Sequence, residues 1–320
     1  MRIFKNNIKW RSAIIYFGII GMVLLFSLTV PNFFSATNLV TVLVSMTLIC
    51  VLSLGVTFVL TIGEIDISIG AAMSVAPCTM VVLSRSGLSI WLSLLIGFVL
   101  VLFLGFLNGL LVSRFSMPSF IATLSTQGIA MGYTRIMTGN KPAAMDSQTI
   151  KDLFGGELMS IPKMILWMII LILVCYFILH RMQFGKNIHC VGDNKEASKM
   201  YGLNVNRYII ASFMCSSLFV FFAGLLDVAR TSFAVAGSGE TLVLNAIVAS
   251  VIGGTSLQGG RGTVIGATAG SFFLALLSNA LFSLGLMPWV TNIVIGSVII
   301  IILTVSGLID KRNMEKTVSV

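Results

Sequence analysis

The sequence predicts an all-helical, polytopic membrane protein with about ten transmembrane helices. Of its 320 residues, 57% are hydrophobic and only 10% are charged, a composition that cannot supply the surface of a water-soluble domain. Apolar stretches of about 20 residues, enough to cross roughly 30 Å of hydrocarbon, follow one another along the chain. No long polar linker separates them. We therefore expect a single membrane domain over residues 1–320.

The first span is expected to hold the amino terminus in the cytoplasm. Residues 1–11 are basic, and no small-x-small cleavage signal precedes Pro31, which is typical of an uncleaved anchor. Lys and Arg concentrate in cytoplasmic loops, and an even number of spans places most of them on that side. Both termini are then cytoplasmic. The expected spans are residues 12–30, 38–61, 67–84, 89–112, 118–138, 163–180, 208–229, 241–257, 263–285 and 289–309.

The third and eighth spans are the weakest, because they are short and rich in Gly and Ser. Two connections are longer than the others. The external loop, about residues 139–162, has room for a turn and a short surface helix. The cytoplasmic loop, about residues 181–207, is polar and basic.

Two similar segments suggest an internal repeat. Asn108 is followed ten residues later by Pro118, and Asn279 nine residues later by Pro288, each proline in a Met-Pro pair. In the expected topology the two pairs lie on opposite sides of the membrane. That placement is typical of an inverted repeat of spans 2–5 and 7–10, although two such pairs can also arise by chance.

The cytoplasmic loop contains a short helix with recognisable ends. Asp193 or Asn194 can cap its start, Glu196 stands three residues after Asp193 as in a capping box, and Gly202 suits a left-handed end. We expect a two-turn helix outside the bilayer. Its other residues offer small, apolar and basic side chains for contact with a partner, namely Lys195, Ala197, Ser198, Lys199, Met200 and Tyr201.

Two carboxylates, Glu64 and Asp66, stand close to the membrane between spans two and three. Charge at membrane depth is costly and tends to mark a functional path, so both are candidates for the translocation pathway. The alternative, which we favour, places them in a turn where Asp66 or Ser68 caps the next helix. Four uncharged polar residues are further pathway candidates, although most such residues only join helices. They are Asn108, Gln127, Asn245 and Thr255.

On the external side, Arg135, Lys141 and Arg230 are candidates for contact with an external protein. Asp227 lies three residues before Arg230, so a local ion pair on one helix is the simpler interpretation of that arginine.

The chain shows no pattern of its own for catalysis, metals or cofactors. Gly254-x4-Gly259-Gly260 lacks the Lys and Ser/Thr of a phosphate-binding loop, and we interpret these glycines as a tight turn with close helix packing. The two histidines and five cysteines have no metal-ligand spacing. Because the net charge of +9 follows from topology, it does not indicate nucleic-acid binding. We expect neither an enzyme nor a bound cofactor or metal.

Three ordered segments resemble the ribose-type permeases of bacterial sugar ABC transporters. Residues 63–70, Gly-Glu-Ile-Asp-Ile-Ser-Ile-Gly, are similar to the Gly-Gly-Ile-Asp-Leu-Ser-Val-Gly segment of that family, with Glu64 in place of the usual Gly. Residues 252–266 are similar to a second segment, with Gln258 where an aromatic residue is frequent. The Glu196-Ala-Ser-x-x-x-Gly202 spacing resembles the EAA loop that engages ATPase subunits.

The resemblance implies a permease subunit in the bacterial inner membrane that imports a monosaccharide or a related small polar solute. Two permease copies, identical or paralogous, would form the pathway. Each would offer residues 193–202 to an ABC ATPase subunit that binds ATP and Mg²⁺, and an external solute-binding protein would deliver the solute. The rival hypothesis is an ion-coupled secondary transporter that uses Glu64 or Asp66.

Overall fold

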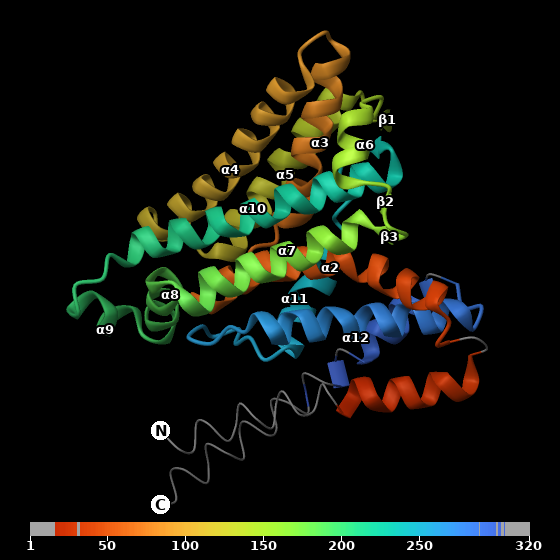
Figure 1. The fold of residues 1–320 in the computed structure, drawn as a ribbon. Helices are drawn as coiled ribbons and strands as arrows, with labels where there is room; N and C mark the ends of the chain where they lie inside the picture. Colours follow the sequence, from red (N-terminus) through yellow and green to blue (C-terminus); the bar gives the residue numbers. More distant parts are fainter. Residues whose placement is uncertain (1–16, 31–32, 288, 299, 302–303, 305–320) are drawn as a thin grey trace, which may run out of the picture.

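The computed structural model describes residues 17–30, 33–287, 289–298, 300–301 and 304, and in them every expected span contains a helix. The long helices run in broadly the same direction, with α8 and α9 at one end of the molecule and the short strands at the other (Figure 1). We call these the α9 end and the strand end. The helices are Phe17–Thr29, α2 (Ala36–Thr61), α3 (Ile69–Arg85), α4 (Ile90–Arg114), α5 (Ser119–Thr138), α6 (Gln148–Phe154), α7 (Lys163–Tyr176), the π-helix Phe177–Arg181, α8 (Gln183–Asp193), α9 (Lys195–Met200), α10 (Val205–Thr231), α11 (Leu242–Ile252), α12 (Val264–Ser283) and Trp289–Val298.

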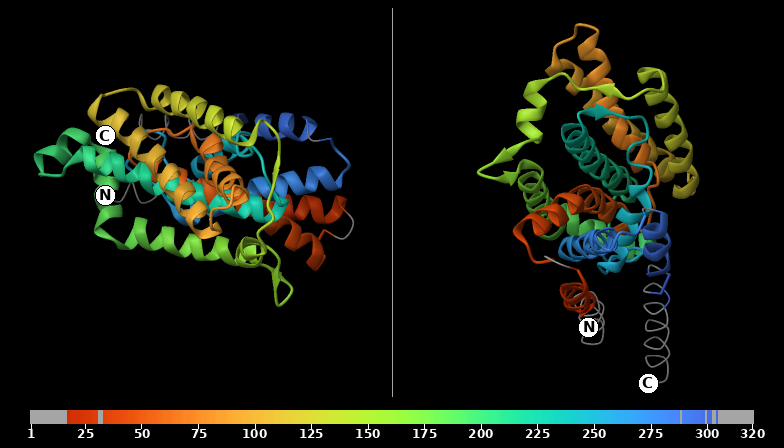
Figure 2. Two further views of the ribbon diagram at one scale, coloured as in Figure 1. Left: turned by 90° about the horizontal axis from the view of Figure 1, so that it is seen from above. Right: turned by 90° about the vertical axis from the view of Figure 1, so that its right-hand side faces the viewer.

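Among the described residues, five helices are long and apolar enough to cross a membrane by themselves: α2, α4, α7 with its π-helical continuation, α10 and α12. The third and eighth expected spans are indeed short, with 17 residues in α3 and 11 in α11. Seen along the helices, α10 lies in the interior with other helices around it (Figure 2).

The strand end is built from the expected external loop and the segment after α10. As expected, the loop forms a short helix, α6. It also forms strands of two residues, which the sequence did not predict. β1 (Ala143–Ala144) pairs antiparallel with β4 (Phe233–Ala234), and β2 (Glu157–Leu158) pairs with β3 (Ile161–Pro162).

The helix packing agrees with the expected inverted repeat for spans 2–4 and 7–9. In the first half α4 packs on α3 and also on α10; in the second half α12 packs on α11 and also on α2. Likewise α10 contacts α3 and α2 contacts α11, while α2 and α10 contact each other. Spans 2–4 are α2, α3 and α4, and spans 7–9 are α10, α11 and α12. Each of these contacts in one half therefore has a counterpart in the other half, as expected for two halves related by a pseudo-two-fold axis.

Small residues bring these helices close together. A Cβ atom on Gly105 of α4 would lie 2.8 Å from the carbonyl oxygen of Phe213 in α10, and one on Gly224 of α10 would overlap the carbonyl oxygen of Met73 in α3. Helices in a membrane gain little from the hydrophobic effect on association, so close van der Waals packing through Gly supplies much of their attraction.

The helices α3 and α11, which form the short third and eighth spans, begin beside each other inside the protein. A Cβ atom on Gly70 of α3 would lie 2.9 Å from the carbonyl oxygen of Gly239, just before α11. Each helix follows a non-helical segment, residues 62–68 before α3 and residues 232–241 before α11. Such interrupted spans in corresponding positions of two halves are typical of transport proteins.

A buried polar network holds the first of these segments. The amide and the hydroxyl of Ser68 both donate to Asp66 Oδ1, at 2.9 and 2.6 Å. Asn108 Nδ2 donates to the Ser68 hydroxyl at 2.9 Å, and Thr126 Oγ1 donates to Asn108 Oδ1 at 2.6 Å. All four side chains are buried. Asn108 therefore links α4 and α5 to the start of α3, and it does so with both ends of its amide.

We expect Gly224→Ala to lower the thermal stability of the detergent-solubilised protein, because the added methyl group overlaps the backbone of α3. Overpacking of this kind costs about 1–3 kcal/mol. The measurement is the temperature at which the monodisperse peak is lost in size-exclusion chromatography. Gly128→Ala is the matched control, because its Cβ atom would meet nothing within 4 Å. Equal stability of the two variants would contradict the close packing of α10 on α3.

We also expect Asn108→Ala to destabilise the protein by about 1–3 kcal/mol, because the hydroxyls of Ser68 and Thr126 each lose a buried partner. The same thermal assay measures the change. Ser125→Ala is the control, since the Ser125 hydroxyl is exposed and bonds only to the carbonyl oxygen of Ile121 on its own helix. A control that is as destabilised as the Asn108 variant would show that the network contributes nothing beyond local hydrogen bonding.

Candidate functional site

The three segments singled out in the sequence meet at the α9 end. The amide of Gly260 donates to the carbonyl oxygen of Thr61 at 2.8 Å, which joins the glycine-rich turn to the end of α2. A Cβ atom on Gly192 of α8 would overlap that same carbonyl oxygen and lie 2.7 Å from the Gly260 nitrogen. We call this meeting point, residues 61–64, 189–195 and 256–262, the glycine junction.

Glycine is required at this junction for two physical reasons. Gly259 and Gly260 have φ angles of +88° and +74°, in the left-handed region that side chains with a Cβ rarely adopt. At Gly192 the backbone of α2 approaches too closely for any side chain. The turn thus has the role expected from its sequence, that of a tight turn with close packing.

The short helix α9 projects from the glycine junction. The Asn194 side chain accepts a hydrogen bond from the amide of Ala197 at 2.9 Å, so Asn194 is the N-cap. Beyond the helix Gly202 has a φ of +81°, as expected. α9 spans six residues, which is shorter than the two turns expected over residues 193–202.

Of the two N-cap candidates, Asn194 caps α9 and Asp193 is the last residue of α8. The expected capping box was wrong, because Glu196 forms an ion pair with Lys199 at 3.0 Å instead. The helix α8 itself was not predicted, because its polar composition suggested a loop. Its apolar residues Ile188 and Val191 nevertheless lie three apart, and both are buried against the bundle.

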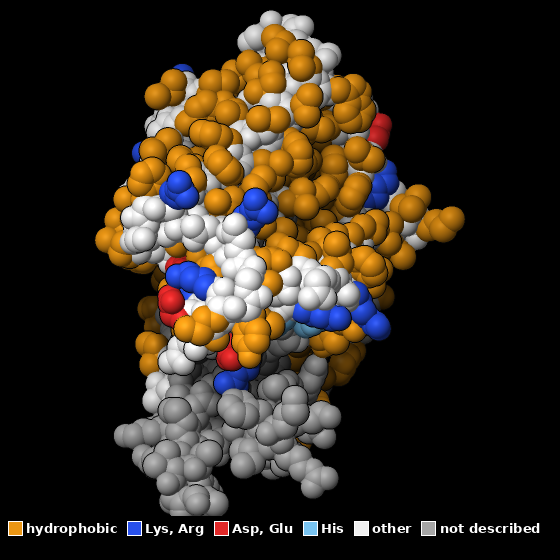
Figure 3. Space-filling view, turned by 90° about the vertical axis from the view of Figure 1, so that its left-hand side faces the viewer, with side chains coloured by type: hydrophobic (Ala, Val, Ile, Leu, Met, Phe, Trp, Pro, Cys, Tyr) orange, Lys and Arg blue, Asp and Glu red, His pale blue; other side chains and the backbone are white. Residues whose placement is uncertain are grey.

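Apolar side chains of α9 point into solvent. Met200 and Tyr201 are each 89% exposed, while Ser198 is buried. Figure 3 looks onto this end of the molecule and shows Lys and Arg side chains spread across it. The exposed basic residues there are Arg114, Arg181, Lys186, Lys199, Arg207 and Arg261. An exposed Met-Tyr pair within a basic surface fits a docking site for a protein with an acidic rim.

An ion pair connects α9 to the segment before α3. Lys195 Nζ lies 2.5 Å from Glu64 Oε1. The two residues are 131 positions apart, and sequence reasoning paired neither with the other. Glu64, a pathway candidate, is therefore tied to α9 at the glycine junction, and Lys195, a candidate for contact with a partner, pairs with a carboxylate of its own chain.

The two histidines also contact this region. His189 Nδ1 donates to the carbonyl oxygen of Gly260 at 3.2 Å, and His180 Nε2 accepts from the amide of Val264 at 3.3 Å. Burial lowers the pKa of His189 below its ordinary value, which the bond to Gly260 opposes, so the ring is mostly neutral near pH 7. The histidines thus connect α8 and the π-helix to the glycine-rich turn and to α12.

The pathway candidates occupy different environments. Asp66 and Asn108 belong to the buried network, and Thr255 is buried beside the glycine-rich turn. Gln127 and Asn245 are partly exposed. Gln127 Nε2 lies 3.5 Å from Glu240 Oε1, which joins α5 to the start of α11 and adds a carboxylate that the sequence analysis did not single out. Their role in a pathway remains a prediction.

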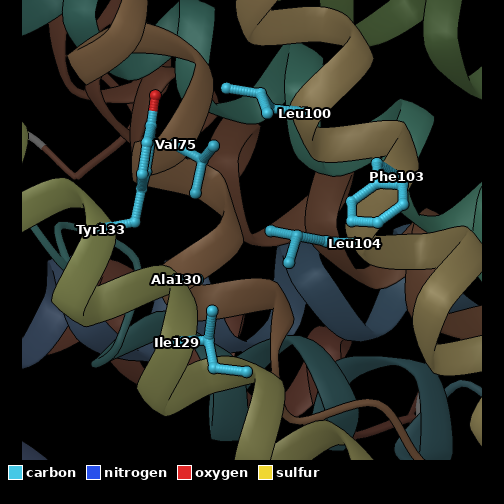
Figure 4. Close-up of a pocket in the computed structure, with 7 residues that line it drawn as sticks. All are labelled: Val75, Leu100, Phe103, Leu104, Ile129, Ala130 and Tyr133. Carbon is cyan, nitrogen blue, oxygen red and sulfur yellow. The ribbon is translucent and has the colours of Figure 1, made fainter.

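A cavity of about 170 Å³ between α3, α4 and α5 has a different character (Figure 4). Its lining is apolar apart from Tyr133, whose hydroxyl lies 2.9 Å from that of Thr79. A hydroxyl-rich solute would lose its hydrogen bonds to water there without gaining others, so this cavity is unsuited to one. The residues that line it are Val75, Leu100, Phe103, Leu104, Ile129, Ala130 and Tyr133.

The three external candidates, Arg135, Lys141 and Arg230, are all exposed at the strand end. Lys141 precedes β1 by two residues and Arg230 precedes β4 by three, and because these strands pair antiparallel the two cations stand before opposite ends of the pair. Arg230 also forms the expected ion pair with Asp227, at 3.3 Å.

Comparison with known proteins gives a consistent result. The sequence matches the family described as branched-chain amino acid transport system, permease component, over residues 38–303. It is 30% identical over 300 residues to the ribose import permease protein RbsC of Bacillus subtilis, covering 93% of this chain and 92% of that protein. It is 31% identical over 292 residues to the probable ABC transporter permease protein YphD of Escherichia coli, covering 91% and 88%.

A further relative is the autoinducer 2 import system permease protein LsrC of Photorhabdus luminescens. The two are 28% identical over 324 residues, covering 100% of this chain and 97% of that protein. The family match and the alignments extend over most of the chain, and the structure places the three segments that resemble ribose-type permeases together at one end of a helical bundle. This chain belongs to the family of permease components of such transport systems.

Proposed function

We propose that this chain is the membrane-spanning permease subunit of an ATP-driven ABC importer in the bacterial inner membrane. The observation that carries the proposal is α9, a capped helix with an exposed Met-Tyr pair, seated on the glycine junction where the segments typical of the family meet. A rigid projection with packed support can transfer the movement of a docked partner into the bundle.

The chain supplies no catalytic chemistry in this scheme. ATP and Mg²⁺ bind to a separate ATPase subunit that docks on α9, and closure of two such subunits moves α9. Two permease copies, identical or paralogous, stand side by side. An external solute-binding protein contacts the strand end, where Arg135, Lys141 and Arg230 offer cations to its acidic side chains.

The imported solute is a monosaccharide or a related small polar molecule. The relatives are named for import of ribose and of autoinducer 2. The polar side chains of Gln127 and Asn245, which are partly exposed, are the contacts that we assign to such a solute. Asp66, Asn108 and Thr255 are buried in this conformation and would line the pathway only after the helices move.

The structure gives less support to the ion-coupled alternative. A proton-coupling or sodium-coupling carboxylate must be able to exchange its ion, whereas Glu64 is paired with Lys195 and Asp66 Oδ1 accepts two hydrogen bonds from Ser68. The similarity to import permeases of ABC type favours ATP coupling as well.

The decisive experiment isolates the subunit from its native membrane in mild detergent and asks what remains bound. We expect an ATPase to co-purify with the natural chain, and Ala197→Glu to abolish that association because it places a charge at the docking surface of α9. Hydrolysis of ATP by the purified sample should be lost in parallel.

Ser86→Glu is the control, because it adds the same charge at an exposed turn next to the strand end and should leave the association intact. If the natural chain purifies without an ATPase and its vesicles take up solute down an ion gradient, the secondary-transporter hypothesis replaces the proposal.

A further inference from the structure

The segment between α2 and α3, residues 62–68, is attached to other elements along its length. Near its start Glu64 pairs with Lys195 of α9. Further along, the amide of Ile65 donates to the Ser119 hydroxyl and the amide of Ile67 donates to the Thr123 hydroxyl, both at 3.2 Å. Ser119 and Thr123 lie one turn apart on α5. The segment therefore connects α9 directly to the first two turns of α5.

The far end of the segment reaches two more helices. Ser68 precedes α3 directly, and its hydroxyl accepts the hydrogen bond from Asn108 of α4. Asn108 in turn accepts from Thr126 of α5. A displacement of Glu64 by a few ångströms would thus act on α3, α4 and α5 through an extended chain whose amides are already bonded, rather than being absorbed by a loose loop.

The ion pair at the start of this connection is less exposed to water than the pair between Lys199 and Glu196. The Glu64 side chain is 11% exposed and that of Lys195 is 39% exposed, whereas both partners of the Lys199–Glu196 pair are at least half exposed. Salt screens buried or partly buried pairs less than exposed ones, and breaking such a pair leaves a desolvated carboxylate without a partner. Of these two ion pairs involving α9, the one between Lys195 and Glu64 is therefore expected to stay formed better when α9 moves.

Resting on the proposed function, we infer that the Lys195–Glu64 ion pair is the joint through which movement of α9 enters the membrane domain. Lys195 and Glu64 are positioning residues in this scheme, and neither touches ATP or the solute. Residues 62–68 carry the movement onward to α5 by two backbone hydrogen bonds, and to α3 and α4 through Ser68. Glu64 stands where the resembling family usually has Gly, so this joint is a feature that the present chain adds to the shared fold.

The test uses the complex of the permease with its co-purified ATPase in lipid nanodiscs. Deuterium exchange is compared before and after the ATPase is trapped with ATP and vanadate, in peptides that cover residues 62–70 and residues 195–203. In the natural complex we expect trapping to change exchange in both regions.

In Glu64→Gln and in Lys195→Met, the change at residues 195–203 should persist, because α9 still follows the ATPase. The change at residues 62–70 should shrink by about two- to five-fold, the factor in an equilibrium constant that corresponds to losing roughly 0.4–1 kcal/mol of ion-pair coupling. The double exchange Glu64→Lys with Lys195→Glu restores the pair with reversed polarity and should recover most of the response. A size-exclusion stability assay on each variant separates this effect from misfolding.

Asp146→Asn is the matched control, because it removes an ion pair with Arg85 at 3.1 Å at the strand end and should leave both responses unchanged. The inference is overturned if residues 62–70 respond equally in the single variants, if the double exchange behaves no better than either single change, or if the natural complex moves α9 without moving residues 62–70. Failure of the proposed function gives a different result, since no ATPase would then co-purify with the natural chain.

Discussion

The fold depends on the need to satisfy backbone hydrogen bonds where helices are interrupted inside the bundle. In residues 62–68 the amide of Glu64 donates to the carbonyl oxygen of Val59, those of Ile65 and Ile67 donate to hydroxyls of α5, and that of Ser68 donates to Asp66. Before α11 the amide of Gly237 donates to the Ser74 hydroxyl at 3.0 Å. An unsatisfied amide in hydrocarbon costs several kcal/mol, so irregular backbone persists here only because neighbouring helices supply acceptors.

The same hydrogen bonds make the interrupted segment a mechanical element. A segment whose amides were bonded to water could change its conformation without moving other helices. Residues 62–68 are instead bonded to hydroxyls of α5 and to Asn108 of α4, so a displacement of this segment also displaces α5 and α4. The glycine junction adds a second constraint, because at Gly192 and Gly260 the backbones of α8, α2 and the glycine-rich turn touch without intervening side chains. Together these features seat α9 on a support that connects to both halves of the bundle.

Sequence patterns were reliable where the signal is local. Long apolar stretches predicted the spans, because a helix that crosses the bilayer by itself needs about 20 apolar residues; the interrupted spans that contain α3 and α11 gave a weaker signal, since these helices are shorter. Asn194 and Gly202 predicted the ends of a short helix, since capping involves residues within one turn. The missed helix α8 shows where this reasoning fails: two buried residues, Ile188 and Val191, give too weak a period in a largely polar helix of eleven residues, and contact with the bundle stabilises the helix.

The sequence by itself determined the fold class, the apolar stretches in which the described residues form helices, the expectation of an inverted repeat and the segments that resemble a permease family. These properties follow from composition and short-range spacing. Only the tertiary structure decided that the three segments converge at the α9 end, and that Lys195 meets Glu64 across 131 positions of sequence. The reason is physical: a pairing between distant residues depends on how the intervening helices pack, and that packing is set by many close contacts at once rather than by any one local pattern.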